Sequence, residues 1–142
     1  MSQLKASLAS FRRLTSIEDV VLSPKDMDNL RWLDRQIKNM TPGALDVAIE
    51  RSRQITEKGY DQTHDDAHKD GQLTDAAKCY IAVAVAQQRE KENRGINLSE
   101  LAGWPFEEPL KQKPTPRENL KIAAALLIAE YDRLGRLDAT GE

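Results

Sequence analysis

The sequence predicts an all-α protein, a single-domain bundle of four to five helices with a long proline-rich loop. The first observation is a repeated start signal, because Ser or Thr caps the first turn and Pro needs no N–H there. This signal occurs at Ser23-Pro24, Thr41-Pro42 and Thr115-Pro116. The second is that apolar residues then recur at intervals of three and four, and the third is that no stretch alternates like a strand. Amphipathic helices of this kind bury their apolar faces against one another.

The first two helices are predicted over residues 24–40 and 43–58. The apolar positions of the first are Met27, Leu30, Leu33, Ile37 and Met40. Those of the second are Leu45, Ala48, Ile49 and Ile55. Lys58-Gly59 closes the second helix, since a basic last turn followed by glycine is typical of a helix end.

A third helix is predicted over residues 71–92. It carries many alanines, which permit a neighbouring helix to approach closely. We expect Asp70 to cap its start, because a carboxylate at that position accepts hydrogen bonds from the first turn.

The last helix is predicted over residues 116–134, with a capping box between Thr115 and Glu118 and an end at Gly135. Since it is apolar nearly all round, we expect it to be the central helix. Replacing Leu127 with alanine should then lower the free energy of unfolding by about 2–5 kcal/mol.

The other segments flank or interrupt the bundle domain, which is predicted over residues 23–136. Residues 1–22 are weakly amphipathic and predict a separate helix, an oligomerisation arm or a disordered leader. Residues 95–116 hold four of the six prolines together with Trp104. A loop this long inside a compact domain is usually functional or flexible. Residues 137–142 are predicted to form a C-terminal tail.

The composition bounds the partners and the location. With 21 basic and 23 acidic side chains the net charge is −2, so nucleic acid is not indicated as a partner. The single cysteine, Cys79, cannot form an internal disulfide, which fits a reducing compartment. The N-terminus lacks the apolar core of a signal peptide, and the longest apolar run, 122–129, is too short to span a bilayer. We expect a cytoplasmic protein that does not enter a membrane.

A polar bend between the second and third helices, residues 60–71, holds both histidines of the chain. Imidazole and carboxylate are ligands for divalent ions such as Zn²⁺, Mn²⁺ or Mg²⁺, and water on such an ion becomes a nucleophile near neutral pH. His64 and His68 are four residues apart and would face one way on a helix. The metal hypothesis assigns His64, His68, Asp65 and a facing Glu50 as ligands.

A structural interpretation of the bend stays open beside the metal hypothesis. Asp65 or Asp66 can hydrogen-bond the backbone of its own turn, and the histidines can tie the bend to a neighbouring helix. The two interpretations differ in what Asp65→Asn does to stability. A functional bend predicts equal or slightly improved stability, whereas a cap or tie predicts a loss of about 0.5–2 kcal/mol.

Basic and aromatic residues suggest a site for a small phosphorylated ligand. If the third and last helix starts converge, the cations form a phosphate-binding cluster; the candidates are Arg51, Arg53, Lys111, Lys113, Arg117 and Lys121. Tyr60, Trp104 and Phe106 are candidates for stacking on a base or for covering one end of the bundle. Solvated helix surface is the alternative for most of the cations.

Several motifs between residues 44 and 136 resemble a family of small tailed-phage and prophage proteins. They include E-R-x-R-Q at 50–54, H-D-D-x-H at 64–68, Trp104-Pro105, Lys113-Pro114 and A-x-L-x-x-A-E at 124–130. The family resemblance implies a phage-encoded accessory protein but no particular activity. More loosely, the chain is similar in architecture to all-α nucleotide pyrophosphohydrolases of the MazG type. The magnesium motifs of that family, E-E-x-x-E and E-x-x-D, do not stand in this sequence.

Three functions follow as hypotheses. In the enzyme, a divalent ion held at the bend activates water against a phosphorylated nucleotide, with Asp65 or Asp66 as ligand or base. In the binding protein, the same residues sequester a nucleotide without turnover. In the interaction module, the N-terminal segment contacts a host protein or a second copy of the chain, and the bend is structural.

Overall fold

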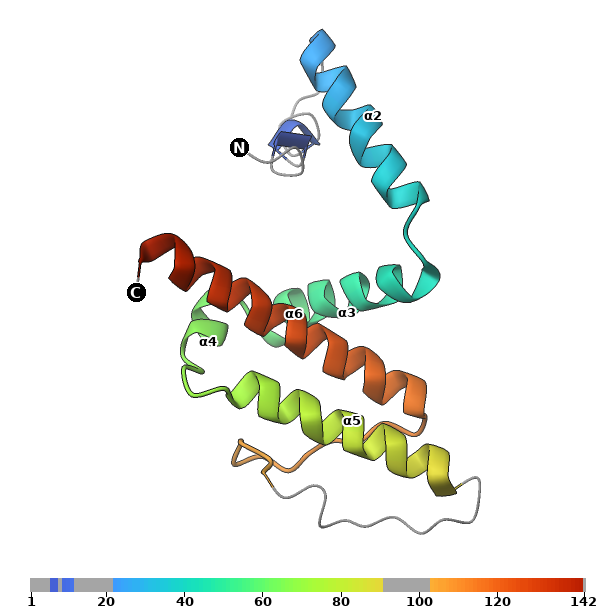
Figure 1. The fold of residues 1–142 in the computed structure, drawn as a ribbon, viewed down its shortest axis with the longest axis vertical. Helices are drawn as coiled ribbons and strands as arrows, with labels where there is room; N and C mark the ends of the chain where they lie inside the picture. The colour runs from blue at the N-terminus through green and yellow to red at the C-terminus, as the bar shows by residue number, and fades with distance from the viewer. Residues whose placement is uncertain (1–5, 8, 12–21, 91–102, 142) are drawn as a thin grey trace. The chain divides into compact units, whose positions relative to one another are not determined.

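The structure is a computed structural model that describes residues 6, 7, 9–11, 22–90 and 103–141 (Figure 1). Its contacts divide the chain into two compact units, Met1–Pro42 and Gly43–Glu142. Whether residues 23–136 form one folding domain stays a prediction. Most of the predicted arm at 1–22 and residues 95–102 of the predicted loop lie outside the described residues.

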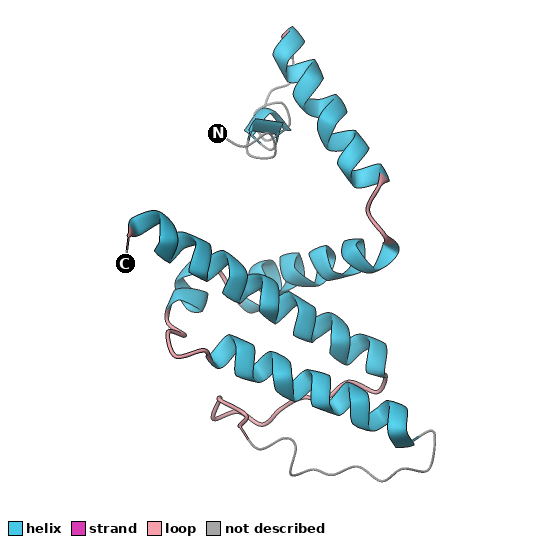
Figure 2. Ribbon diagram, viewed as in Figure 1, coloured by secondary structure: helices cyan, strands magenta, loops and turns pink. Residues whose placement is uncertain are grey.

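The described residues form helices and loops and contain no strand, which confirms the all-α class (Figure 2). The helices are α2 (Pro24–Lys38), α3 (Pro42–Lys58), α4 (Gln62–Asp66), α5 (Gln72–Glu90) and α6 (Pro116–Thr140). Four of them match the predicted helices within a few residues at each start. The fifth, α4, lies in the bend, where the sequence analysis predicted no helix. No described helix is both long and apolar enough to cross a membrane.

In the first unit, α2 begins with a capping box. The Ser23 hydroxyl accepts from the Asp26 N–H, and the Asp26 carboxylate accepts from the Ser23 N–H at 3.3 Å. The other Asp26 oxygen accepts from the Ser10 hydroxyl at 3.1 Å, and Asn29 donates to Ser10 at 3.1 Å. Buried polar groups therefore join the short helical segment around Ser10 to α2.

The second unit is built on the packing of α5 against α6. Small side chains make up most of the buried apolar residues of these two helices; the buried alanines are Ala76, Ala77, Ala84, Ala123, Ala125 and Ala129. Because each projects only a methyl group, the two helices can approach closely. Leu73, Val83 and Tyr80 of α5 add the larger buried side chains.

The predicted end of the last helix at Gly135 is wrong. The helix α6 continues to Thr140 and ends at Gly141, whose φ of 73° is the left-handed conformation that glycine adopts at little cost. A glycine inside a helix costs only about 1 kcal/mol relative to alanine, so Gly135 does not by itself stop α6. Residues 137–140, predicted as tail, are therefore the last turn of α6.

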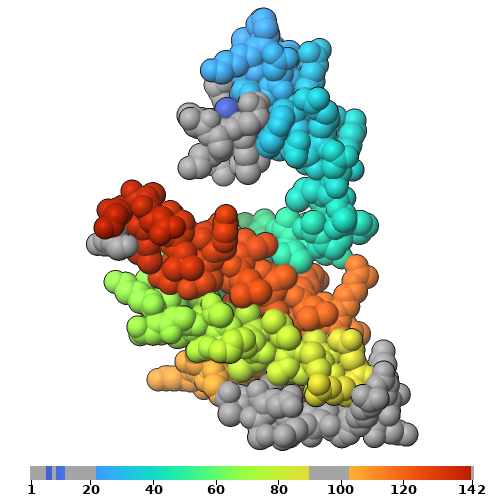
Figure 3. Space-filling view, viewed as in Figure 1, coloured from blue at the N-terminus to red at the C-terminus, as the bar shows by residue number. Residues whose placement is uncertain are grey.

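The expected burial of Leu127 is also wrong, because this side chain is 43% exposed. Only one side of α6 meets the rest of the second unit, and the opposite side keeps large apolar residues at the surface. Figure 3 shows α6 at the surface of this unit along its length. The stability loss predicted for Leu127→Ala assumed burial within one chain and no longer follows.

Asn119 fastens the loop that precedes α6. Its side-chain amide is fully buried, accepts from the Lys113 N–H at 2.8 Å and donates to the Lys113 and Thr115 carbonyls at 2.9 and 3.0 Å. It also donates to the Gln87 side chain of α5 at 2.9 Å, and Gln87 in turn donates to the Lys113 carbonyl at 2.7 Å. The backbone at Lys113 is thus fixed to both long helices.

Candidate functional site

The bend begins with two tight local structures. Gly59, with φ of 70°, ends α3, and the Tyr60 N–H donates back to the Gln54 carbonyl at 3.0 Å. Asp61 then caps α4, because its carboxylate accepts from the His64 N–H at 3.0 Å. The predicted cap at Asp70 is wrong: Gly71, with φ of 78°, occupies the position before α5, and its carbonyl accepts from the Asp75 N–H.

Six rings form a continuous belt that starts at this bend. Tyr60 stacks on His64 with centroids 4.5 Å apart, and His64 meets His68 edge-on at 4.8 Å. His68 meets Phe106 at 5.2 Å, Phe106 meets Trp104 at 5.3 Å, and Trp104 meets Tyr80 at 5.9 Å. We call these six residues the ring belt. It joins the bend, the proline-rich loop and α5, three segments that are far apart in the sequence.

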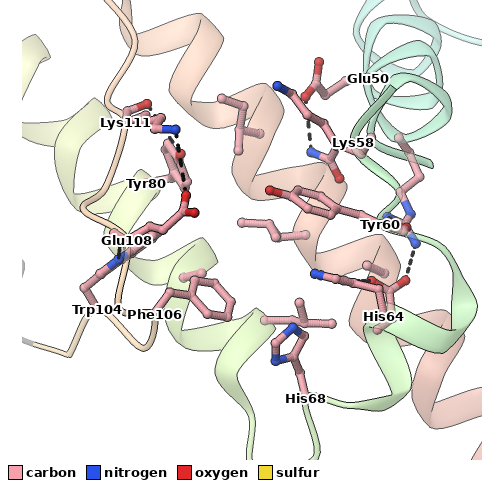
Figure 4. Close-up of a pocket in the computed structure, with 18 of the residues that line it drawn as sticks. Glu50, Lys58, Tyr60, His64, His68, Tyr80, Trp104, Phe106, Glu108 and Lys111 are labelled. Carbon is pink, nitrogen blue, oxygen red and sulfur yellow. Dashed lines mark hydrogen bonds and ion pairs between the residues drawn. The ribbon is translucent and has the colours of Figure 1, made fainter. Parts of the chain in front are cut away.

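The ring belt borders a cavity of about 520 Å³. Apolar side chains of α5 and α6 contribute to the lining; they include Leu73, Ala76, Ile122, Leu126 and Ala129. Charged and polar residues from α3, α4 and the loop also line it; they are Glu50, Arg51, Arg53, Gln54, Lys58, Asp65, Glu107, Glu108, Lys111 and Lys113. In Figure 4, His68 and Phe106 lie on one side of the cavity, and Lys58 and Lys111 lie on the other.

The loop side of the cavity is held by two side chains that donate to loop carbonyls. Trp104 donates from its indole N–H to the Glu108 carbonyl at 2.6 Å, and the Tyr80 hydroxyl donates to the Lys111 carbonyl at 3.4 Å. Trp104 and Leu110 also pack against the buried cluster of Ala77, Tyr80 and Ala123. Trp104 therefore both covers this part of the core and borders the cavity.

Asp65, predicted as a catalytic residue and metal ligand, is 1% exposed and forms a buried ion pair with Arg51 of α3. Arg51 also donates to the Tyr60 carbonyl at 3.0 Å. The other Asp65 oxygen lies 3.4 Å from His64 Nδ1. The carboxylate thus joins α4 to α3 by an ion pair, a structural role that the sequence analysis assigned to the histidines instead.

Asp66, the other predicted catalytic residue, does not line the cavity. It accepts from Arg136 of α6 at 2.6 and 3.2 Å. The Arg136 hydrogen bond is the main reason that the pKa of Asp66 lies below its usual value. Asp66 therefore joins α4 to α6 outside the candidate site.

Glu50, the fourth predicted metal ligand, is held by its neighbours on α3. Arg53 donates to its two oxygens at 2.8 and 3.0 Å, and Gln54 donates at 3.2 Å. The Arg53 hydrogen bonds lower the pKa of Glu50 against the opposing effect of burial, and they raise the pKa of Arg53. Glu50 stays ionised and paired within the lining.

The described residues contain no group of three or more His, Cys, Asp and Glu side chains placed to hold a metal ion. His64 and His68 are adjacent, but Asp65 is engaged by Arg51 and Glu50 by Arg53. Burial, followed by the neighbouring His64, lowers the pKa of His68, so this ring is neutral at pH 7. The predicted four-ligand set does not fit a metal centre in this arrangement.

The predicted phosphate cluster is only partly assembled. Lys113 and Arg53 line the cavity, whereas Arg117 and Lys121 do not. Arg117 is instead paired with Asp46 of α3 at 2.7 Å with 81% of its side chain exposed. Of the predicted ligand-binding residues, Arg53, Tyr60, Trp104 and Lys113 are thus brought to one cavity.

The sequence analysis missed two residues of the lining, Lys58 and Gln54, and one residue outside it that fastens the loop, Asn119. Lys58 lines the cavity, although the sequence marks it only as the basic last residue of a helix. Gln54 and Asn119 are buried polar residues on helices that look amphipathic. The only sequence signal for their burial is that each is a polar residue among the apolar positions of its helix.

Comparisons with models of protein families, with curated proteins and with solved structures give no match to this chain. The resemblances to phage proteins and to MazG-type enzymes therefore stay predictions. The arrangement of the cavity is the basis on which a function can be proposed.

Proposed function

We propose that the cavity bordered by the ring belt binds a small phosphorylated nucleotide without turning it over. The observation that supports this most strongly is that one cavity is bordered by rings and by cations, with His68 and Phe106 on one side and Lys58 and Lys111 on the other (Figure 4). A nucleotide has the same division, since a flat base is joined through a sugar to a phosphate. The volume of the cavity, about 520 Å³, lies in the range of small-molecule sites.

The base is proposed to lie against the ring belt. Stacking of a base on an aromatic side chain contributes about 1–3 kcal/mol and tolerates every base, because each has a π-face. Neutral His68 suits such a contact, since a charged imidazole would be costly to desolvate there. The apolar side chains of Leu73, Ile122 and Leu126 provide further contact area.

The phosphate is proposed to lie at Lys58 and Lys113. The two arginines of the lining, Arg51 and Arg53, are paired with Asp65 and Glu50. Lys58 and Lys113 form no ion pair with any residue in the described part of the chain. The Lys113 backbone is fixed by Asn119, so its side chain starts from a defined position. A lysine whose backbone is already fixed loses less entropy when it binds an anion.

Two buried polar atoms in the lining support a ligand with hydrogen-bonding edges. Gln54 Oε1 and Arg51 Nε are buried and have no hydrogen-bond partner in the structure as described. The orientation of the Gln54 amide follows from its bond to Glu50, which requires the nitrogen on that side. Buried polar atoms are usually satisfied, and a ligand that both donates and accepts would satisfy these two.

Binding is favoured over hydrolysis because the donor set does not fit a metal. In the setting that the phage resemblance suggests, the protein would hold a nucleotide in the host cytoplasm. Metal-assisted hydrolysis remains the runner-up, favoured by the contact between His64 and His68.

The test is to denature purified protein, identify any released small molecule and titrate a nucleotide panel by calorimetry, with and without Mg²⁺, Mn²⁺ or Zn²⁺. We expect a nucleotide to bind and to be recovered unchanged. Phe106→Leu should weaken binding by about tenfold or more, because it removes one stacking ring. Lys113→Gln should weaken nucleotides but not nucleosides, whereas Lys69→Gln, outside the lining, is the matched control.

Recovery of hydrolysed product in the presence of a metal ion would support the enzyme instead. No binding by any nucleotide at millimolar concentration would contradict the proposal. Equal weakening by Lys113→Gln and Lys69→Gln would contradict the assigned phosphate position.

A further inference from the structure

An apolar face of α6 is a feature of the second unit that the cavity does not use. Leucines recur every seven residues at Leu120, Leu127 and Leu134, with Ala124 and Tyr131 between them. The leucines are 43%, 43% and 46% exposed, and Tyr131 is 78% exposed. We call these five residues the leucine face. Its spacing of three and four is the pattern by which one helix packs along another.

The leucine face lies on the side of α6 that α5 does not cover. Ala123, which packs against Ala77 and Tyr80, and Asn119, which donates to Gln87, mark the covered side. Figure 3 shows that no other described segment of the second unit lies over α6 in that view. Contiguous patches of exposed apolar residues are typical of interaction surfaces in soluble proteins.

We propose that the leucine face is the contact surface of an antiparallel homodimer, in which α6 of one copy crosses α6 of a second copy near Leu127. The partner is a second copy of the chain because the two ends of the leucine face carry opposite charges and side chains of complementary size.

The charges flanking the face change sign along α6. Arg117 and Lys121 stand at its N-terminal end, and Asp132 and Asp138 stand at its C-terminal end. The two aspartates form no ion pair with any described residue. An antiparallel crossing near Leu127 brings the basic end of one copy to the acidic end of the other. A parallel pair would place like charges together, which is unfavourable, and would also align the helix dipoles.

The side-chain sizes have the same complementarity. Tyr131 lies four residues after Leu127, and Ala124 lies three residues before it. In the antiparallel pair, the large ring of Tyr131 therefore meets the level of the small Ala124 of the second copy. A parallel pair would oppose the two Tyr131 rings and leave a gap between the two Ala124 methyl groups.

The test is the mass of the full chain by sedimentation over a range of micromolar concentrations. We expect twice the chain mass of 16.0 kDa. Leu127→Lys should weaken association by more than about tenfold, because it places an ammonium in an apolar contact. Ile81→Lys is the matched control, since Ile81 is 37% exposed on α5 and should leave the dimer intact.

A second variant, Tyr131→Lys, guards against misfolding of the first, and circular dichroism checks that both retain helix. For orientation, Leu120→Cys and Leu134→Cys proteins are oxidised separately and as a mixture; Cys79 is buried and does not compete. We expect a disulfide dimer mainly in the mixture. A monomeric wild-type chain, or a dimer unaffected by both lysine variants, would overturn the proposal. Disulfide dimers formed mainly within each separate variant would overturn the antiparallel arrangement.

Discussion

Replacing Asp65 with asparagine is expected to lower the free energy of unfolding by about 3–5 kcal/mol, as found when one partner of a buried ion pair is removed. The side chains of Asp65 and Arg51 are 2% and 11% exposed. The substitution leaves the Arg51 guanidinium buried without a counter-charge, and its Nε already lacks a partner. Chemical unfolding monitored by circular dichroism measures the loss.

The neighbouring carboxylate provides the matched control. Asp66 is also paired with an arginine, but 43% of its side chain is exposed. Because solvent screens such a pair, Asp66→Asn should cost much less. Adding Arg51→Met to Asp65→Asn should recover part of the loss, since both charges are then absent. Equal losses for the two aspartates, or an Asp65→Asn protein as stable as the wild type, would refute the structural role of Asp65.

Replacing Asn119 with leucine is expected to lower the free energy of unfolding by roughly 2–4 kcal/mol, because several part-buried groups lose a hydrogen-bond partner worth up to about 1–3 kcal/mol each. The Lys113 N–H and the Gln87 amide oxygen are among them. Leucine has the same number and branching of side-chain heavy atoms as asparagine, so the substitution leaves no cavity. Thermal or denaturant unfolding measures the loss.

The same substitution should also loosen the loop that carries Lys113, so that proteolysis between residues 103 and 115 becomes faster. Asn39→Leu is a suitable control, because Asn39 is exposed after the end of α2. A loss for Asn119→Leu no larger than that for Asn39→Leu would show that the hydrogen bonds of Asn119 do not fasten the loop.

The helix starts could be predicted from the sequence because their signals are local. Ser23 and Thr115 accept hydrogen bonds from residues three positions later, and proline follows each. The end of α6 could not be predicted from Gly135, because a single glycine costs little in a helix whose neighbours are strong helix formers.

The candidate site was predictable only where residues are close in sequence. His64 and His68 were expected to be adjacent, and their rings are 4.8 Å apart. The partner of Asp65 could not be predicted, because Arg51 is fourteen residues away and is one of several arginines and lysines on the chain. Likewise, periodicity shows that α6 is apolar but not which side meets α5, so the exposure of Leu127 was missed.

The central claim is that the cavity places a base against the ring belt and a phosphate at its cationic side. The most direct measurement is the fluorescence of Trp104 in a Trp32→Phe protein, titrated with a nucleotide, its nucleoside and ribose 5-phosphate. Trp104 belongs to the ring belt, whereas Trp32 lies in the first unit. We expect saturable quenching by the nucleotide, with the nucleoside and ribose 5-phosphate each binding at least about tenfold more weakly, since each supplies only one of the two contacts. Fluorescence that stays unchanged up to millimolar nucleotide would contradict the claim.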